Sequence, residues 1–251
     1  MRINQTPADD SHLTDRSWPA AMVFDFDGLL MDTESTSFES WRFEWQQWGL
    51  TLDPATFFAD HGGDVTDHRH AALAAAVGGS FDGDLSRRRR VQYREQLHAD
   101  LDLLPGLRSW LLEARRAGIR LAIASSSPSD WVIGHLGRVG AEREFEVCAY
   151  GNEVGAPKPE PDVYLLALDR LGITSDRAVA VEDTPHGVAA AKEAGLSCIA
   201  IPNPFAAIER FAAADLVLGS ASQLSLSDAL QRLRARGHGD DPDVMNGSAS
   251  P

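Results

Sequence analysis

Two aspartates, Asp25 and Asp27, end an apolar run of the chain, and Gly28 follows them at once. In an extended segment, side chains two positions apart point the same way, so both carboxylates can face one small site. Two anions held close together repel unless a cation lies near them, and Mg²⁺ prefers a few carboxylates together with water and phosphate oxygen. The spacing therefore indicates a magnesium site. A plain strand-end turn is the alternative, because Asp and Gly are common there.

A second acidic pair, Glu182 and Asp183, ends another apolar run, and Thr184 follows it. If the two runs are strands of one sheet, Asp183 can complete a metal site with the first pair. The alternative is that Asp183 or Thr184 caps the helix that comes next, and one residue can do both.

Groups suited to phosphate follow at two further points. Ser125, Ser126 and Ser127 end a third apolar run, where hydroxyls and backbone N–H groups beside a helix start suit a phosphate; a simple helix cap explains them equally well. Lys158 stands among three alternating prolines, which remove backbone donors and fix φ, so its loop is stiff. A lone lysine is usually solvated, but an immobilised ammonium group is a candidate phosphate clamp.

Short, continuously apolar runs are expected to be the buried strands that position these side chains. Such runs are typical of a parallel sheet covered on both faces, and ligands of open α/β sheets bind at the carboxyl ends of the strands. Helical segments between the runs imply a doubly wound, Rossmann-like α/β sheet. The expected strands are residues 21–26, 120–124, 147–150, 178–181 and 197–201, with a weaker sixth at 216–218, and the expected helices are 107–117, 162–171 and 187–194.

Residues 35–104 interrupt this alternation and contain no convincing strand. Helical stretches at 38–48, 67–77 and 85–98 predict a small all-α cap domain inserted after the first strand. We expect an α/β core domain in residues 18–34 and 105–235 and disordered tails in 1–17 and 236–251. The aromatic stripe at residues 38–48 is predicted to be cap core, and the basic run 87–90 a solvated helix face.

The composition limits the classes of function. The chain has 251 residues, 43% of them hydrophobic, and a formal net charge of −14, which disfavours binding to nucleic acid or to an anionic membrane. No run approaches the roughly 20 apolar residues that span a bilayer. Two distant cysteines make a disulfide framework unexpected and suit a reducing cytoplasm. We expect a cytoplasmic monomer or weak homodimer.

The motifs occur in an order that resembles the haloacid dehalogenase superfamily, and more narrowly its β-phosphoglucomutase-like branch with a helical cap. The resemblance covers residues 22–218 and implies a Mg²⁺-dependent phosphohydrolase acting on a small phosphorylated metabolite. It implies that Asp25 is the nucleophile that becomes an aspartyl-phosphate and that Asp27 is the general acid and base. By the same resemblance, the Asp25 side chain, the Asp27 carbonyl and the Asp183 side chain hold Mg²⁺, Glu182 supports the metal through water, Ser125 binds the transferring phosphoryl group, and Lys158 steadies nucleophile and phosphate.

Substrate contacts are expected from residues beside these. They are Gly28, Ser126, Ser127 and, in the cap, His61 and Gly63; an exposed helix start is the alternative for His61.

Three other activities are weighed against phosphate ester hydrolysis. A sugar phosphomutase of this branch must hold a second phosphate, but Pro128 stands where a basic residue is expected, so hydrolysis is favoured. Dehalogenases of this fold lack an acid at the position of Asp27, which disfavours carbon–halogen cleavage. A non-catalytic phospho-ligand-binding protein is the alternative of another class, because fold alone does not establish function.

Overall fold

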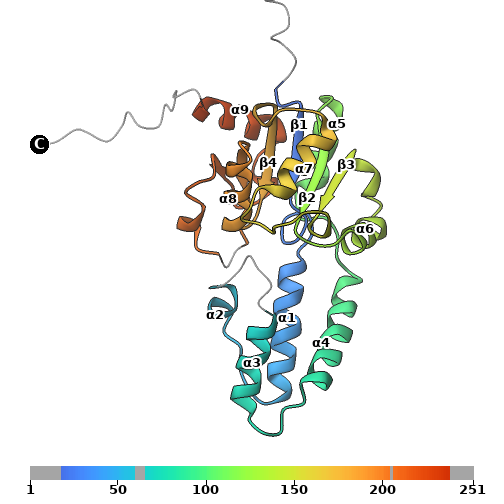
Figure 1. The fold of residues 1–251 in the computed structure, drawn as a ribbon, viewed down its shortest axis with the longest axis vertical. Coiled ribbons are helices and arrows are strands. Elements are labelled where there is room, and N and C mark those ends of the chain that lie inside the picture. The colour runs from blue at the N-terminus through green and yellow to red at the C-terminus, as the bar shows by residue number, and fades with distance from the viewer. Residues whose placement is uncertain (1–17, 60–65, 204–205, 238–251) are drawn as a thin grey trace, which may run out of the picture.

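The computed structural model describes residues 18–59, 66–203 and 206–237. Figure 1 shows a sheet with helices on both faces and a separate group of helices beyond one end of the sheet. The strands are β1 (Ala21–Phe24), β2 (Arg120–Ser125), β3 (Val147–Tyr150), β4 (Ala178–Glu182), β5 (Ser197–Ala200) and β6 (Leu216–Val217). The helices are α1 (Thr33–Gln47), α2 (Pro54–Ala59), α3 (Thr66–Val77), α4 (Gly83–His98), α5 (Leu107–Arg116), α6 (Ser129–Arg138), α7 (Asp162–Leu171), α8 (Pro185–Glu193) and α9 (Leu226–Gly237).

The six strands form one sheet in the order β3-β2-β1-β4-β5-β6, and every neighbouring pair is parallel. This confirms the predicted Rossmann-like α/β fold. The chain adds β2 and β3 on one side of β1 and then β4, β5 and β6 on the other, so the direction of the strand order changes at β1. Phe24 of β1 lies in register with Ile123 of β2 and Val181 of β4. The carboxyl ends of β1, β2 and β4 therefore meet at one edge of the sheet, where ligands of such folds bind.

Both faces of the sheet are buried, which is why its strands read as continuous apolar runs. Larger side chains such as Met22 and Phe24 pack on the side of α5, α6 and α9. Smaller ones such as Ala21 and Val23 pack against α7 and α8. The alternation of side chains along each strand thus supplies both layers of the core.

Helices α1 to α4 lie beyond the end of β1 (Figure 1) and have a core of their own. Phe38 and Trp41 of α1 pack there with Leu73 of α3, as the aromatic stripe predicts. The exact division into core, cap and tails stays a prediction.

The basic run on α4 is not wholly solvated, which corrects the sequence expectation. Arg87 and Arg88 are exposed, but Arg89 donates to the fully buried carboxylate of Glu44, with its Nη2 2.5 Å from Oε1. Arg90 is buried, with its guanidinium 3.6 Å from the centroid of the Trp41 ring. Half of this run therefore joins α4 to α1.

Further details differ from the sequence prediction. β1 ends at Phe24, two residues early, because the following loop folds on itself: Gly28 N donates to Met31 O at 2.8 Å and Leu30 N to Phe26 O at 2.9 Å. The sequence prediction gives no range for α2, α6 or α9. In the described part of the chain, no helix combines the length and apolar character needed to cross a bilayer.

Candidate active site

Three carboxylates meet at the edge of the sheet where β1 and β4 end. One oxygen from each of Asp25, Glu182 and Asp183 lies within 4.8 Å of the others, and all three residues are buried. The Lys158 ammonium lies beside them, 2.5 Å from Asp25 Oδ1 and 2.6 Å from Glu182 Oε1. Lys158 also donates to the carbonyl of Ala124, the residue before the end of β2, at 2.9 Å. The structure thus brings together residues that the sequence places far apart.

The electrostatics of this group favour a bound cation. Burial raises the pKa of Asp25 well above its usual range, Lys158 opposes that rise, and Glu182 and Asp183 add to it. Burial also raises the pKa of Asp183, and Glu182 adds to the effect. Burial alone would lower the pKa of Lys158, but Asp25 and Glu182 outweigh it and raise that pKa. Three ionised carboxylates and one ammonium leave a net charge of −2, which a divalent cation would balance.

Glu182 is held by several donors. Its Oε1 accepts from Lys158 and from the phenol of Tyr164 at 2.7 Å, and its Oε2 accepts from the backbone N–H of Asp183 at 3.1 Å. A Cβ on Gly187 would lie 2.0 Å from both oxygens, so the start of α8 packs directly onto this carboxylate. Because both of its oxygens already accept hydrogen bonds from the protein, Glu182 is suited to orienting the groups around it.

Gly28 packs against Asp183, the acid that directly follows β4. Its φ is +80°, and a Cβ at this position would lie 2.1 Å from Oδ2 of Asp183. Only glycine fits such a close approach in that backbone region. Gly28 therefore supports Asp183, and it is not among the residues that line the cleft described below.

The Asp27 carboxylate lies apart from the three clustered carboxylates and has three donors of its own. Its Oδ1 accepts from the Thr33 hydroxyl at 2.8 Å and from the indole N–H of Trp131 at 2.9 Å. Its Oδ2 accepts from the Ser127 hydroxyl at 2.6 Å. Donors from α1, from α6 and from the loop after β2 thus fix the carboxylate in one orientation.

A cleft of about 530 Å³ opens onto these groups, a size suited to a small metabolite. Asp25, Asp27 and Lys158 line it together with Ser125 and Ser126 at the end of β2. Ser125 is almost fully buried, and its Oγ accepts from Ser127 N at 3.1 Å. Further lining residues are Thr33, Glu34, Ser37, Thr66, Arg69, Arg94, Ser127, Trp131, Pro157, Thr184 and His186.

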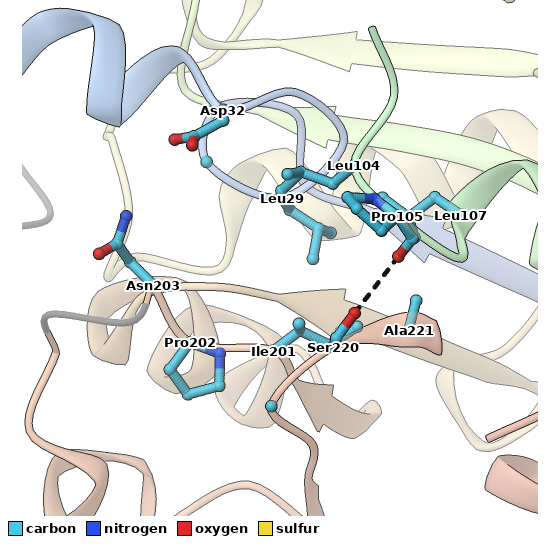
Figure 2. Close-up of a pocket in the computed structure, with 12 residues that line it drawn as sticks. Leu29, Asp32, Leu104, Pro105, Leu107, Ile201, Pro202, Asn203, Ser220 and Ala221 are labelled. Carbon is cyan, nitrogen blue, oxygen red and sulfur yellow. Dashed lines mark hydrogen bonds between the residues drawn. The ribbon is translucent and has the colours of Figure 1, made fainter. Parts of the chain in front are cut away.

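A second, smaller cavity of about 130 Å³ is separate from this chemistry. Figure 2 shows it between Leu29 and Asp32 on one side and Pro202 and Asn203 on the other. None of the clustered carboxylates lines it. The cleft is therefore the candidate active site. Of the residues predicted to contact substrate, His61 and Gly63 lie outside the described residues.

Comparison with known proteins identifies the family. The family model for haloacid dehalogenase-like hydrolases matches residues 22–201, which is more than half of the chain. The chain belongs to this family of hydrolases.

Several relatives are similar over most of the chain. YhcW of Bacillus subtilis, provisionally named a phosphatase, is 31% identical over 86% of this chain and 98% of its own length. The phosphorylated carbohydrates phosphatase of Thermotoga maritima is 32% identical over 71% of this chain and 83% of its own. A crystal structure of a provisionally assigned β-phosphoglucomutase from Thermotoga maritima superposes with a TM-score of 0.71 at 27% identity, covering 84% and 98% of the two chains. This neighbour agrees with the predicted branch of the haloacid dehalogenase-like hydrolases.

Sequence reasoning missed three side chains that hold carboxylates of this hydrolase site, namely Thr33, Tyr164 and Trp131. Tyr164 is a lone phenol in an apolar helix, and a buried phenol normally requires a hydrogen-bond partner, so its position was a usable signal. Trp131 gives a weaker signal, because its side chain is only partly buried and its indole N–H could donate to water instead. Its role depends on how α6 meets the loop after β1.

Proposed function

We propose that this hydrolase cleaves small phosphate monoesters, with carbohydrate phosphates as the substrate class, through a phosphorylated Asp25. The observation that carries the proposal is the buried Asp25 carboxylate, 2.5 Å from the Lys158 ammonium, beside Glu182 and Asp183 in an open cleft. Such an arrangement serves phosphoryl transfer, in which positioning and charge neutralisation dominate catalysis. The relatives named as phosphatases support the same reaction class.

The first step forms a covalent intermediate. An oxygen of Asp25 attacks the phosphorus, the P–O bond to the leaving group breaks, and the departing oxygen takes a proton from the Asp27 carboxyl group. Lys158 reduces the repulsion between Asp25 and the negatively charged phosphate. The hydroxyl of Ser125 and the neighbouring Ser126 bind the remaining phosphate oxygens.

The second step releases phosphate. The ionised Asp27 takes a proton from a water molecule, whose oxygen attacks the phosphorus and breaks its bond to Asp25. This frees the Asp25 carboxylate and inorganic phosphate and leaves Asp27 protonated for the next cycle. The three donors that fix Asp27 hold one carboxyl group in place for both proton transfers.

Mg²⁺ is the cofactor in this proposal. Hard carboxylate oxygens, a buried site and a net charge of −2 fit a divalent cation that prefers oxygen ligands. The Asp25 and Asp183 side chains and the Asp27 carbonyl would hold it. Glu182, whose carboxylate is fixed by hydrogen bonds, would support the metal through water. When bound, Mg²⁺ stabilises negative charge on the transferring phosphoryl group.

A phosphomutase is the second candidate, because one structural relative is provisionally assigned as a β-phosphoglucomutase. Pro128 precedes α6 where a basic residue for the second phosphate was expected, so hydrolysis is favoured. The presence of Asp27 likewise disfavours dehalogenation, since a departing halide needs no proton.

The test is phosphate release by the purified protein from p-nitrophenyl phosphate and from a panel of sugar phosphates. We expect release with Mg²⁺, its loss in EDTA, and its loss in Asp25→Asn with an unchanged circular dichroism spectrum. Asp169→Asn, at an exposed position on α7, is the matched control and should keep full activity. Isomerised hexose phosphate without free phosphate would favour the mutase, and binding without turnover would favour a non-catalytic protein.

A further inference from the structure

The wall of the cleft beside Asp27 carries a basic residue that the proposed reaction does not use. Arg94 of α4 lines the same cleft as Asp25 and Asp27. Its guanidinium lies 5.6 Å from the centroid of the Trp131 ring, and the indole N–H of Trp131 donates to Asp27 Oδ1 at 2.9 Å. Arg94 and Trp131 therefore belong to the side of the cleft that contains the proposed acid.

This position determines which part of a substrate the two residues meet. The acid that protonates the leaving oxygen must lie within hydrogen-bond reach of that oxygen. The carbon skeleton attached to the leaving oxygen then extends from Asp27 toward the neighbouring wall. Trp131 and Arg94 are on that wall, whereas Lys158 and Ser125 are beside the phosphate end. In the proposed reaction, the leaving group is therefore the part of the substrate expected nearest to Arg94, and the transferred phosphate is not.

Lys158 and Arg69 also line the cleft, but their side chains already have partners within the protein. Lys158 is paired with Asp25 and Glu182. Arg69 donates to the carbonyl of Phe57 at 3.1 Å and stacks on the Phe57 ring. Within the described residues no carboxylate forms an ion pair with Arg94, whose side chain is only partly exposed. A partly buried guanidinium without an acidic partner is suited to an anionic ligand.

Two imidazoles hold the Trp131 ring in place. The Trp131 ring packs against His135 and His98, with ring centroids 4.2 and 5.3 Å away. His135 Nδ1 lies 2.9 Å from the Trp131 carbonyl, and His98 Nε2 lies 3.0 Å from the Thr36 hydroxyl. Burial, followed by the charges of His135 and Arg94, lowers the pKa of His98 to about 4, so it is neutral near pH 7. On the cleft side, Arg94 thus provides a positive charge beside Trp131.

We propose that Trp131 and Arg94 form a recognition site for the leaving group, with Trp131 contacting a sugar's carbon skeleton and Arg94 binding an anionic substituent on it. This inference rests on the proposed phosphatase function and narrows its substrates to phosphorylated carbohydrates that carry a second negative group. A carboxylate and a second phosphate share the required chemistry, since both accept two parallel hydrogen bonds from guanidinium.

The experiment compares matched substrates in wild-type protein and Arg94→Met. Gluconate 6-phosphate and glucose 6-phosphate differ at the carboxylate, and fructose 1,6-bisphosphate and fructose 6-phosphate differ at the second phosphate. We expect wild-type kcat/KM to be higher for the anionic member of at least one pair. Arg94→Met should lower kcat/KM for that member by roughly 10- to 100-fold more than for its neutral partner, mainly through KM. The pair that responds identifies the anion.

Arg88→Met is the control, because Arg88 is exposed on the same helix and its loss changes the net charge equally. It should leave both ratios unchanged. Equal effects of Arg94→Met on both members of each pair, or a wild-type protein that prefers the neutral members, would overturn the inference alone. A wild-type protein that releases phosphate from no ester, p-nitrophenyl phosphate included, would overturn the proposed function and this inference with it.

Discussion

Replacing Asp183 by Asn should stabilise the metal-free protein while abolishing its response to Mg²⁺. Asp183 is fully buried, and burial together with Glu182 raises its pKa well above the usual value. An ionised carboxylate at this site is therefore unfavourable without a cation. Asn has nearly the same shape and carries no charge, so the substitution reduces the net charge of the cluster from −2 to −1.

The size of the effect follows from the charge that is removed. Replacing one member of a buried like-charge group by a neutral isostere should raise the free energy of unfolding by roughly 1–3 kcal/mol. For a chain of this length that corresponds to a rise in Tm of roughly 2–10 °C. In the wild-type protein, Mg²⁺ at 100 times its Kd should add about 2.7 kcal/mol. Asp183→Asn removes a ligand and should show little of this gain.

The assay is thermal unfolding followed by circular dichroism, in EDTA and in Mg²⁺, for wild-type protein and Asp183→Asn. Asp169→Asn serves as control, because its exposed side chain should change stability by less than about 0.5 kcal/mol. A lower Tm for Asp183→Asn in EDTA would refute the electrostatic reasoning. An undiminished rise in Tm with Mg²⁺ would refute the assignment of Asp183 as a ligand.

Three further predictions follow from single contacts. Gly28→Ala should reduce both activity and Mg²⁺ affinity, because the added Cβ would lie 2.1 Å from Asp183 Oδ2. Gly140→Ala controls for backbone strain, because Gly140 also has a positive φ but has nothing within 4 Å of an added Cβ. Equal losses in the two variants would contradict the reasoning. Trp131→Phe should lower kcat for p-nitrophenyl phosphate by roughly 10-fold, because one donor to Asp27 is lost, and an unchanged kcat in steady-state assays would argue against this role. The pKa of His98 falls to about 4 on folding, so between pH 6.5 and 4 the unfolded chain binds more protons and stability is lost as pH falls. From pH 7 to 5 this loss is about 2 kcal/mol; urea unfolding should show it reduced in His98→Gln, and an equal loss in both proteins would exclude His98 as its source.

Much of the sheet and the acidic cluster could be predicted from the sequence, because their signals are local. Continuous apolar runs mark strands with two buried faces, and carboxylates directly after such runs must lie at the sheet edge. Asp25, Glu182 and Asp183 were found in this way and are brought together by the fold. Lys158 was found from the rigidity of its proline-rich loop and is the counter-ion of two of them.

The remaining features depend on contacts that no local pattern reports. Gly28 reads as a turn residue, whereas its fit against Asp183 depends on how the loop after β1 meets the end of β4. Arg90 reads as part of a solvated basic run, but α4 packs on α1 and stacks it on Trp41. Arg94 is indistinguishable from its neighbours until α4 is placed beside α6.

The central claim, that Asp25 is a covalent nucleophile, is tested most directly by the stereochemical course at phosphorus. The substrate is a phosphate monoester made chiral with three oxygen isotopes, and the configuration of the product is determined after transfer to an alcohol acceptor. Two successive displacements, first by Asp25 and then by the acceptor, predict overall retention of configuration. Inversion would mean that the acceptor attacks the substrate directly and would contradict the account.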